Sequence, residues 1–382
     1  MLGRTALRRF AGKAKDIKVP LSSFDPHLLP KGLAVPASGS ISSDELVSGL
    51  KDMFTIRRLE MVLDGLYKTQ KIRGFCHLYD GQEAIAVGLD QILTPKDPLI
   101  QAYRHHGACV MRKIPVYNII CELIMKKDGW TKGKGGSMHL YDREHNYFGG
   151  NGIVGAQCPV GTGLAFALKY EGNKENVAAV MYGDGAANQG QLYEAANIAS
   201  LWKLPVVYIC ENNNFAMGTS VARHSAGGGD FHKKIYNVPG LKVDGHSLVE
   251  VREATKFAKK FALEHGPIVL NMITYRYHGH SMSDPGSTYR NREEVTEKRR
   301  TVDCIKLAED LILANKVMTE QELEDFKNKI TAEVDADRDR ALASENISPQ
   351  ELLTDVYSPD FKHFLRGKNY EDSIFVKQKL IE

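Results

Sequence analysis

An aspartate inside a glycine-rich turn and a run of asparagines could together hold a metal-bound diphosphate. The turn "VMYGDGAANQGQ", residues 180–191, follows an apolar run and begins a helical pattern, so its backbone amides can face an anion. Asp184 would repel a bare pyrophosphate, which favours an intervening divalent cation with several oxygen ligands. The next apolar run ends in "ENNNF", residues 211–215. We therefore predict that Asp184, an asparagine and a nearby main-chain carbonyl share one ion.

Each of these groups alone has a simpler structural interpretation. An aspartate in such a turn commonly caps a helix, and an asparagine run commonly forms a turn. The combination is more specific, because adjacent parallel strands bring their carboxyl ends together, where open α/β sheets bind ligands.

A second polar segment, "YRYHGHSMSDPGSTYR" at residues 275–290, holds two histidines, two arginines and four serine or threonine side chains. It follows "GPIVLNMIT", which is typical of a buried strand after a Gly-Pro break. The segment is therefore predicted to lie at the same ligand-binding edge. A histidine in a polar loop is, by itself, more often solvated than catalytic.

Two other glycine-rich segments do not favour a nucleotide site. "GGNGIVG" carries Gly150, Gly152 and Gly155 at dinucleotide-motif spacing, but the polar "YDREHNYF" before it predicts no hydrophobic strand. "GWTKGKGGSMH" lacks the Gly-Lys-Ser order of a phosphate-binding P-loop. The acid inside the turn at Asp184 and the missing third glycine also argue against a nicotinamide-dinucleotide protein.

The elements that must position these groups alternate between strand and helix patterns. "VAAVMY" (177–182) and "LPVVYIC" (204–210) are predicted strands, and "GQLYEAANIASLWK" between them is a predicted helix, which favours a mainly parallel sheet covered by helices. Ser42 with Glu45, and Thr319 with Glu322, have capping-box spacing at the start of two further helical patterns.

Composition excludes several classes of protein. Of 382 residues, 43% are hydrophobic, and no apolar run approaches the roughly 20 residues that a membrane span needs. The first fifteen residues carry five basic side chains and no acidic one, and removing these charges from the net +3 leaves −2. A nucleic-acid partner is therefore not expected, while the basic start is typical of an organelle transit peptide, or else of a disordered tail. The six scattered cysteines are expected to be reduced and structural.

Including the Asp184 motif, much of the chain closely resembles the alpha subunits of the decarboxylating component of mitochondrial pyruvate dehydrogenase complexes. These subunits belong to the thiamine diphosphate-dependent 2-oxo acid dehydrogenases. The resemblance runs from about residue 45 to 300 and rests on these segments: "RGFCHLYDGQEA", "AYRHHG", "KGKGGSMH", "GGNGIVGAQ", "GDGAANQGQLYEA", "ENNNFAMGTS" and "YRYHGHSMSDPGSTYR".

The resemblance implies an α/β thiamine diphosphate-binding fold with a mainly parallel sheet, helices on both faces and a C-terminal helical appendage. It implies four segments: a mitochondrial presequence at 1–15, an N-terminal arm at 16–44, the cofactor-binding domain at 45–300 and a helical extension at 301–382.

By the same motifs, Mg²⁺ would be held by Asp184, Asn213 and the main-chain carbonyl of Phe215. The residues implied to contact thiamine diphosphate are Tyr103, Arg104, Gly152, Val154, Asp184, Gly185, Ala186, Asn213, Phe215 and His280. His77 and His280 match the catalytic histidines of the family, while the roles of His278 and His106 stay open.

The implied reaction is decarboxylation of pyruvate with transfer of the two-carbon fragment to a lipoyl group on the acyltransferase component, in the mitochondrial matrix. Beta subunits complete an α₂β₂ heterotetramer and contribute the glutamate that activates the aminopyrimidine, since neither Glu83 nor Glu211 matches it. Serines of the histidine-rich loop are phosphorylation sites in the family, with Ser281 here as the expected main switch and Thr288 (with Ser287 beside it) at the second position. Ser220 in "AMGTS" matches the third, and these residues are the expected substrates of a regulatory kinase and phosphatase.

Two alternatives remain. The branched-chain 2-oxo acid counterpart shares the fold and the cofactor, but it tends to have Glu inside the glycine turn and a "GHHSTSD"-like loop. A non-catalytic regulatory or scaffold subunit could keep the fold, although the retained Asp184, Asn213, His77 and His280 speak against it.

Overall fold

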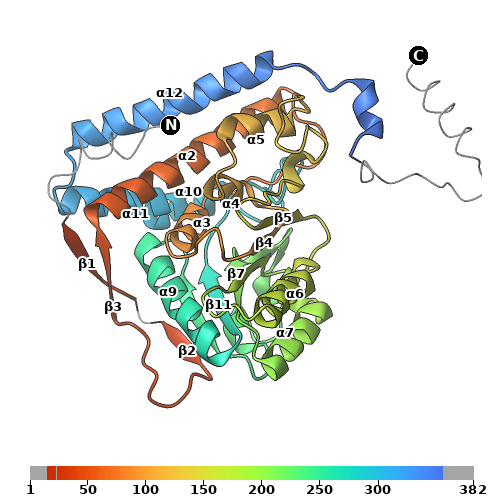
Figure 1. The fold of residues 1–382 in the computed structure, drawn as a ribbon. Coiled ribbons are helices and arrows are strands. Elements are labelled where there is room, and N and C mark those ends of the chain that lie inside the picture. Colours follow the sequence, from red (N-terminus) through yellow and green to blue (C-terminus); the bar gives the residue numbers. More distant parts are fainter. Residues whose placement is uncertain (1–14, 23, 356–382) are drawn as a thin grey trace, which may run out of the picture.

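The computed structural model describes residues 15–22 and 24–355 and contains a seven-stranded sheet between helices (Figure 1). All neighbouring strands are parallel except the edge strand β2, which runs antiparallel to β10. In spatial order the strands are β2 (Asp25–His27), β10 (Gly240–Asp244), β11 (Ile268–Ile273), β7 (Val206–Asn212), β6 (Ala178–Gly183), β4 (Leu99–Ala102) and β5 (Tyr147–Asn151). The predicted mainly parallel α/β fold is confirmed.

Helices cover both faces of this sheet because its central strands are apolar on both sides. In β6, Ala178, Val180 and Tyr182 belong to one apolar cluster, whereas Ala179 and Met181 belong to the other. The alternation follows from the two-residue period of a strand. The first cluster includes α6 (Gln157–Tyr170) and α7 (Gly190–Trp202), and the second includes α3 (Glu83–Asp90) and α9 (Leu248–His265).

The N-terminal and C-terminal helices form a further layer, in which α12 lies along α2 (Figure 1). Both predicted capping boxes are present, from Ser42 with Glu45 at α2 and from Thr319 with Glu322 at α12. Arg58 of α2 makes an ion pair of 2.5 Å with Asp335 of α12. The helices of this layer are α2 (Ser43–Lys68), α10 (Arg292–Val302), α11 (Cys304–Ala314) and α12 (Glu320–Ala343).

The N-terminal arm contains strand structure. Its strands β1 (Asp16–Pro20) and β3 (Ser38–Ser42) pair with each other, and β2 between them joins the main sheet. The presequence prediction, apart from Lys15, and the last part of the helical extension, residues 356–382, lie outside the described residues. The division of the chain into four segments stays a prediction.

The remaining described elements are short. They are α4 (His106–Met111), α5 (Val116–Leu123), α8 (Val221–His224), the hairpin of β8 (Phe215–Ala216) and β9 (Thr219–Ser220), and 3₁₀ turns at Gly136–Met138, Ala186–Asn188, Phe231–Lys233 and Pro349–Leu353. Across residues 15–22 and 24–355, none of the helices combines the length and apolar character needed to cross a bilayer. All six cysteines are unpaired and buried, as predicted.

The expectation that no strand precedes the glycines at 150, 152 and 155 was wrong. Tyr147–Asn151 forms β5, and Gly152 and Gly155 then lead into α6. The sequence pattern did not predict this strand because glycines, and not apolar side chains, occupy two of its buried positions. A side chain at Gly150 would meet the main-chain oxygen of Met138 at 2.5 Å, so close packing, and not apolar character, explains its residue type.

Candidate active site

A pocket lies at the carboxyl ends of four neighbouring strands, β4, β6, β7 and β11. The chain runs from β4 outward to β5 and then returns to β6 on the other side of β4, so the order of strands reverses there. Open α/β sheets bind ligands at such a reversal. The cavity has a volume of about 330 Å³, within the range of small-molecule sites.

Most of the predicted cofactor-binding residues line this pocket. They are Tyr103, Arg104, Val154, Asp184, Gly185, Ala186, Asn213, Phe215 and His280. Gly152 and His77 do not line it. Gly152 lies against the ring of His139, which a Cβ added at Gly152 would approach to 3.4 Å. The ring of His77 is tilted against that of Tyr103, with 4.4 Å between ring centroids.

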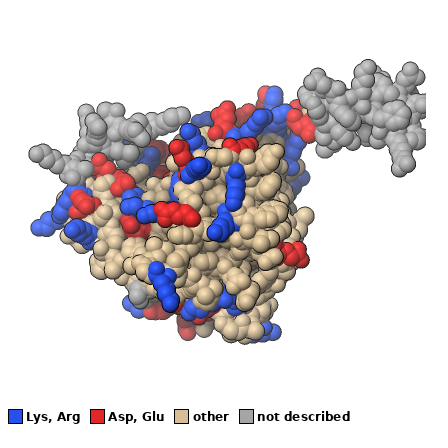
Figure 2. Space-filling model, turned by 60° about the horizontal axis from the view of Figure 1, so that its bottom comes forward, with Lys and Arg blue, Asp and Glu red and all other residues tan. Residues whose placement is uncertain are grey.

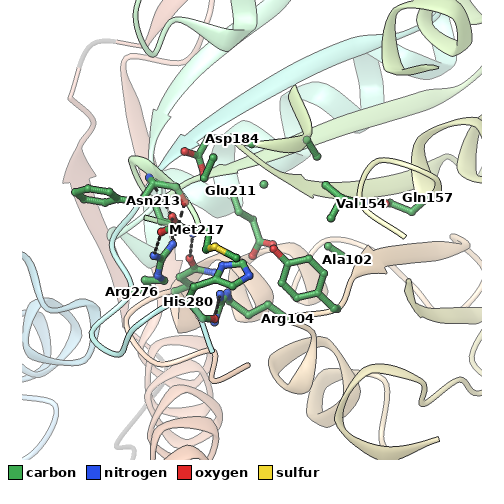
Figure 3. A pocket seen from close by; sticks show the side chains of 17 residues that line it. Ala102, Arg104, Val154, Gln157, Asp184, Glu211, Asn213, Met217, Arg276 and His280 are labelled. Atoms are coloured by element: carbon green, nitrogen blue, oxygen red, sulfur yellow. Dashed lines mark hydrogen bonds between the residues drawn. The ribbon is translucent and has the colours of Figure 1, made fainter. Parts of the chain in front are cut away.

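The three predicted metal ligands come from two adjacent strand ends. Gly183 of β6 pairs with Glu211 of β7, so Asp184 and Asn213 leave the sheet side by side, and Figure 3 shows both at the pocket. Asp184 is 1% exposed, and its Oδ2 has no hydrogen-bond partner, with His224 Nε2 at 3.4 Å. A buried carboxylate oxygen without a donor is costly unless a cation neutralises it.

The other two predicted ligand atoms already converge on a positive group. Arg276 donates from one terminal nitrogen to Asn213 Oδ1 at 3.0 Å and to the Phe215 carbonyl at 2.9 Å, along the dashed lines of Figure 3. Its second terminal nitrogen donates to the Met217 carbonyl. A carboxylate, an amide oxygen and a main-chain carbonyl at one edge are hard oxygen donors, and this set fits a small divalent cation.

The histidines at the pocket carry no charge near neutral pH. Burial lowers the pKa of His77 to about 2, and the Arg104 guanidinium contributes further. Burial, with Arg104 and Arg276, likewise lowers the pKa of His280 to about 3. Their ring centroids are 5.2 Å apart. His77 Nδ1 is buried without a hydrogen-bond partner, so this atom is available for a hydrogen bond to a bound ligand.

Glu211 is a second buried carboxyl in the pocket wall. Burial raises its pKa to about 7, although hydrogen bonds from Tyr79 and Gln101 oppose this rise. The Tyr79 hydroxyl donates to Oε1 at 2.5 Å and the Gln101 amide donates to Oε2 at 3.0 Å. Both carboxyl oxygens therefore have partners within the chain.

The three predicted phosphorylation positions differ in exposure. Ser281 is only 7% exposed, and its hydroxyl pairs with that of Ser283 at 2.9 Å. Thr288 is exposed at the tip of the loop. Ser220 is half-buried in β9, where it pairs with Phe215 of β8, one of the predicted metal ligands.

Sequence reasoning missed several pocket residues. Arg276 was noted only as one of the two arginines in the histidine-rich loop, although it donates to two predicted ligand atoms. Gln82 accepts a hydrogen bond of 3.0 Å from the Asn213 amide and so orients that side chain. Gln157 and Met217 also line the cavity. Gln82, Gln157 and Met217 lie in segments already noted for their motifs, but their spacing carries no chemical signal.

Comparison with known proteins assigns the amino-acid sequence to one family. The model for the family described as "Dehydrogenase E1 component" matches residues 51–350. The chain is 49% identical over 370 residues to the mitochondrial pyruvate dehydrogenase E1 component subunit alpha of Dictyostelium discoideum, covering 96% of this chain and 95% of that protein. It is 50% identical to subunit alpha-1 of Oryza sativa subsp. japonica, covering 92% and 90%. It is 45% identical to the testis-specific alpha subunit of Homo sapiens, covering 96% and 93%.

Proposed function

We propose that this chain decarboxylates pyruvate in the mitochondrion as the alpha subunit of a thiamine diphosphate-dependent dehydrogenase. The premise is that the chain belongs to the dehydrogenase E1 component family. The activity class is pyruvate dehydrogenase (acetyl-transferring). The observation that carries the site assignment is the buried, unpartnered Asp184 oxygen beside two further oxygen donors at a strand-order reversal.

The chain's own residues bind and orient the cofactor. Asp184, Asn213 and the Phe215 carbonyl would hold Mg²⁺, whose positive charge would offset the negative charge of the diphosphate. Gly185 and Ala186 stand at the first turn after β6, where backbone amides can bind phosphate oxygens. A Cβ at Gly185 would lie 2.9 Å from the Ala216 side chain, so glycine permits the close approach of two chain segments. Val154, which lines the pocket, and Gly152, which does not line it, would both lie beside the cofactor.

When bound, thiamine diphosphate would supply a thiazolium that accepts the electron pair left behind as CO₂ departs. Around it, the neutral imidazoles of His77 and His280 can donate a hydrogen bond from one ring nitrogen and accept one at the other. Arg104 lines the same pocket, and its guanidinium donates to the Leu78 and His280 carbonyls at 2.6 and 2.7 Å. It thus holds the two histidine-bearing segments together while adding positive charge beside an anionic substrate.

The subunit partner is a beta chain, and we propose an α₂β₂ heterotetramer in the matrix that passes the acetyl group to a lipoyl domain. An exposed apolar surface supports such assembly, because monomeric proteins rarely expose large contiguous apolar areas. It runs from the pocket edge across α6 and α7 and consists of Ile153, Val154, Val160, Phe166, Tyr170, Ile198, Leu201 and Trp202. Figure 2 shows charged groups scattered around a wide uncharged area on one face.

The purified chain alone is expected to show no pyruvate decarboxylation, because the glutamate that activates the aminopyrimidine belongs to the beta subunit. Neither local glutamate replaces it, since Glu211 is saturated by two hydrogen bonds and Glu83 is paired with Arg57. Turnover should appear when the beta chain is added. CO₂ release would be measured for both samples, and release by the chain alone at the rate of the complex would contradict the assignment.

Pyruvate is expected to be preferred over 2-oxoisovalerate by the reconstituted complex. Competing substrates that differ by small apolar groups are typically separated by about 10- to 200-fold in kcat/KM for each methylene. The two kcat/KM values would be compared in one preparation. A preference for 2-oxoisovalerate would instead assign the chain to the branched-chain 2-oxo acid dehydrogenases. Calorimetry with thiamine diphosphate and Mg²⁺ would distinguish either enzyme subunit from a non-catalytic scaffold subunit, which would bind neither the cofactor nor the ion.

A further inference from the structure

His278 lies between two carboxylates in the loop that connects β11 to α10. Its Nδ1 is 2.8 Å from Asp80 Oδ2, and its Nε2 is 3.6 Å from Asp64 Oδ1. Asp64 belongs to α2, and Asp80 precedes α3, so the imidazole joins the loop to two separate parts of the fold. The side chain is 32% exposed, whereas that of Asp80 is buried.

The charged imidazole fits this arrangement best. Nδ1 hydrogen-bonds to Asp80, while Nε2 lies at ion-pair distance from Asp64 Oδ1, which has no hydrogen-bond partner, so a positive ring is attracted to both carboxylates. Burial is the largest influence and lowers the pKa of His278, but the hydrogen bond and charge of Asp80, with the charge of Asp64, outweigh it and raise the pKa above its ordinary value. The pKa of Asp80 moves in the opposite direction: burial raises it, but the His278 hydrogen bond and nearby positive charges lower it overall.

Other charged groups also face this cluster. Arg299 of α10 is 3.9 Å from Asp80 Oδ2, and Lys68 of α2 is 2.7 Å from Asp64 Oδ2. Arg57 of α2 acts on Asp80 through its charge. These arginine and lysine side chains keep their charge near neutral pH, so His278 is the member of the described cluster whose charge changes there.

The loop is also fixed at its neighbouring residues. Arg290 donates to the His278 carbonyl at 2.6 Å, Arg104 donates to the His280 carbonyl, and the Met282 amide donates to the Cys76 carbonyl at 2.9 Å. Between these anchors, His280 lines the pocket and Ser281 is buried. A change at His278 therefore acts two residues from a pocket histidine.

We propose that His278 is a positioning residue: by bridging Asp80 and Asp64 it holds the loop so that His280 faces the pocket, and loss of its proton releases the loop. A group whose pKa is raised in the folded state contributes its full stabilisation below its ordinary pKa. That stabilisation is lost as pH rises through the raised value. The loop is accordingly held in acidic to neutral solution and released on the alkaline side, which also exposes Ser281.

Hydrogen exchange of residues 276–290 in the complex with the beta chain tests this proposal. After correction for intrinsic exchange, protection in the unmodified protein should fall as pH rises. At pH 6.5, His278→Gln should exchange about tenfold faster, the effect of losing a charge-assisted hydrogen bond, and its protection should no longer depend on pH. Asp64→Asn keeps the histidine but removes one carboxylate, so the loss of protection should move to lower pH.

His265→Gln is the matched control, because His265 is an exposed histidine on α9 and should leave the loop unchanged. Wild-type protection in His278→Gln, or an unchanged pH midpoint in Asp64→Asn, would overturn the proposal. The pH profile of kcat/KM for pyruvate gives a second readout, whose alkaline limb should follow the exchange midpoint. This activity readout rests on the proposed function, whereas the exchange measurement does not, so failure of either can be recognised separately.

Discussion

Asp184→Asn should weaken thiamine diphosphate binding in the presence of Mg²⁺ by more than about 100-fold, because loss of even an indirect partner of a metal ligand typically costs 10- to 100-fold. The same substitution should leave the cofactor-free protein at least as stable. Asp184 Oδ2 is buried without a hydrogen-bond partner, and an unsatisfied buried polar group typically costs about 1–3 kcal/mol. Removing the negative charge relieves that cost.

Calorimetric titration with and without Mg²⁺ would measure the first effect, and thermal unfolding without cofactor would measure the second. Asp310→Asn is a suitable control, because Asp310 is an exposed aspartate on α11, far along the chain from the pocket residues. Tight Mg²⁺-dependent binding of thiamine diphosphate by Asp184→Asn would contradict the assignment of Asp184 as a metal ligand. Loss of binding together with a large loss of stability would instead indicate a structural role.

Ser281→Glu is expected to reduce pyruvate turnover by the complex by about 100-fold or more, since displacing a catalytic group by about 1 Å can have an effect of that size. Ser281 is buried, and its carbonyl accepts from the Asp284 amide, so a new carboxylate there would be desolvated near an existing one. Asp284 also accepts from the His280 amide at 2.7 Å. Repulsion between the two carboxylates should therefore move His280. A phosphate, with a charge of about −1.5 to −2, would act more strongly.

Thr288→Glu provides the matched comparison, because Thr288 is exposed and a carboxylate there stays solvated. Its turnover should fall by less than about threefold, as expected for a surface substitution. Ser281→Ala removes the hydroxyl without adding charge and should remain active. Steady-state turnover of pyruvate would be measured for all three, and normal turnover by Ser281→Glu would refute the assignment of Ser281 as the main regulatory serine.

The strands and the glycine-rich turn that carries Asp184 could be predicted because their signals are local. The apolar runs of β6 and β7 are buried on both faces, and Asp184 and Asn213 directly follow their ends. The capping boxes likewise depend on residues three positions apart. In β5, by contrast, tight packing replaces apolar side chains with glycine, and the hydrophobic signal disappears.

The role of Arg276 illustrates what local patterns miss. Its position in a polar loop indicated only positive charge, but the parallel pairing of β11 with β7 brings it to Asn213 and Phe215. That neighbour relation depends on the order of strands in the sheet, which motif spacing does not contain.

By itself, the sequence determined the α/β class, the turn that carries Asp184 and the histidine-rich loop, because strand periodicity and turn chemistry act over a few residues. The tertiary structure alone decided the pKa values of the loop's histidines. His278 and His280 are two positions apart, yet Asp80 and Asp64 raise the pKa of His278, while burial beside Arg104 and Arg276 lowers that of His280. A pKa depends on burial and on charges brought from distant parts of the chain, so the same residue type in the same loop acquires shifts in opposite directions.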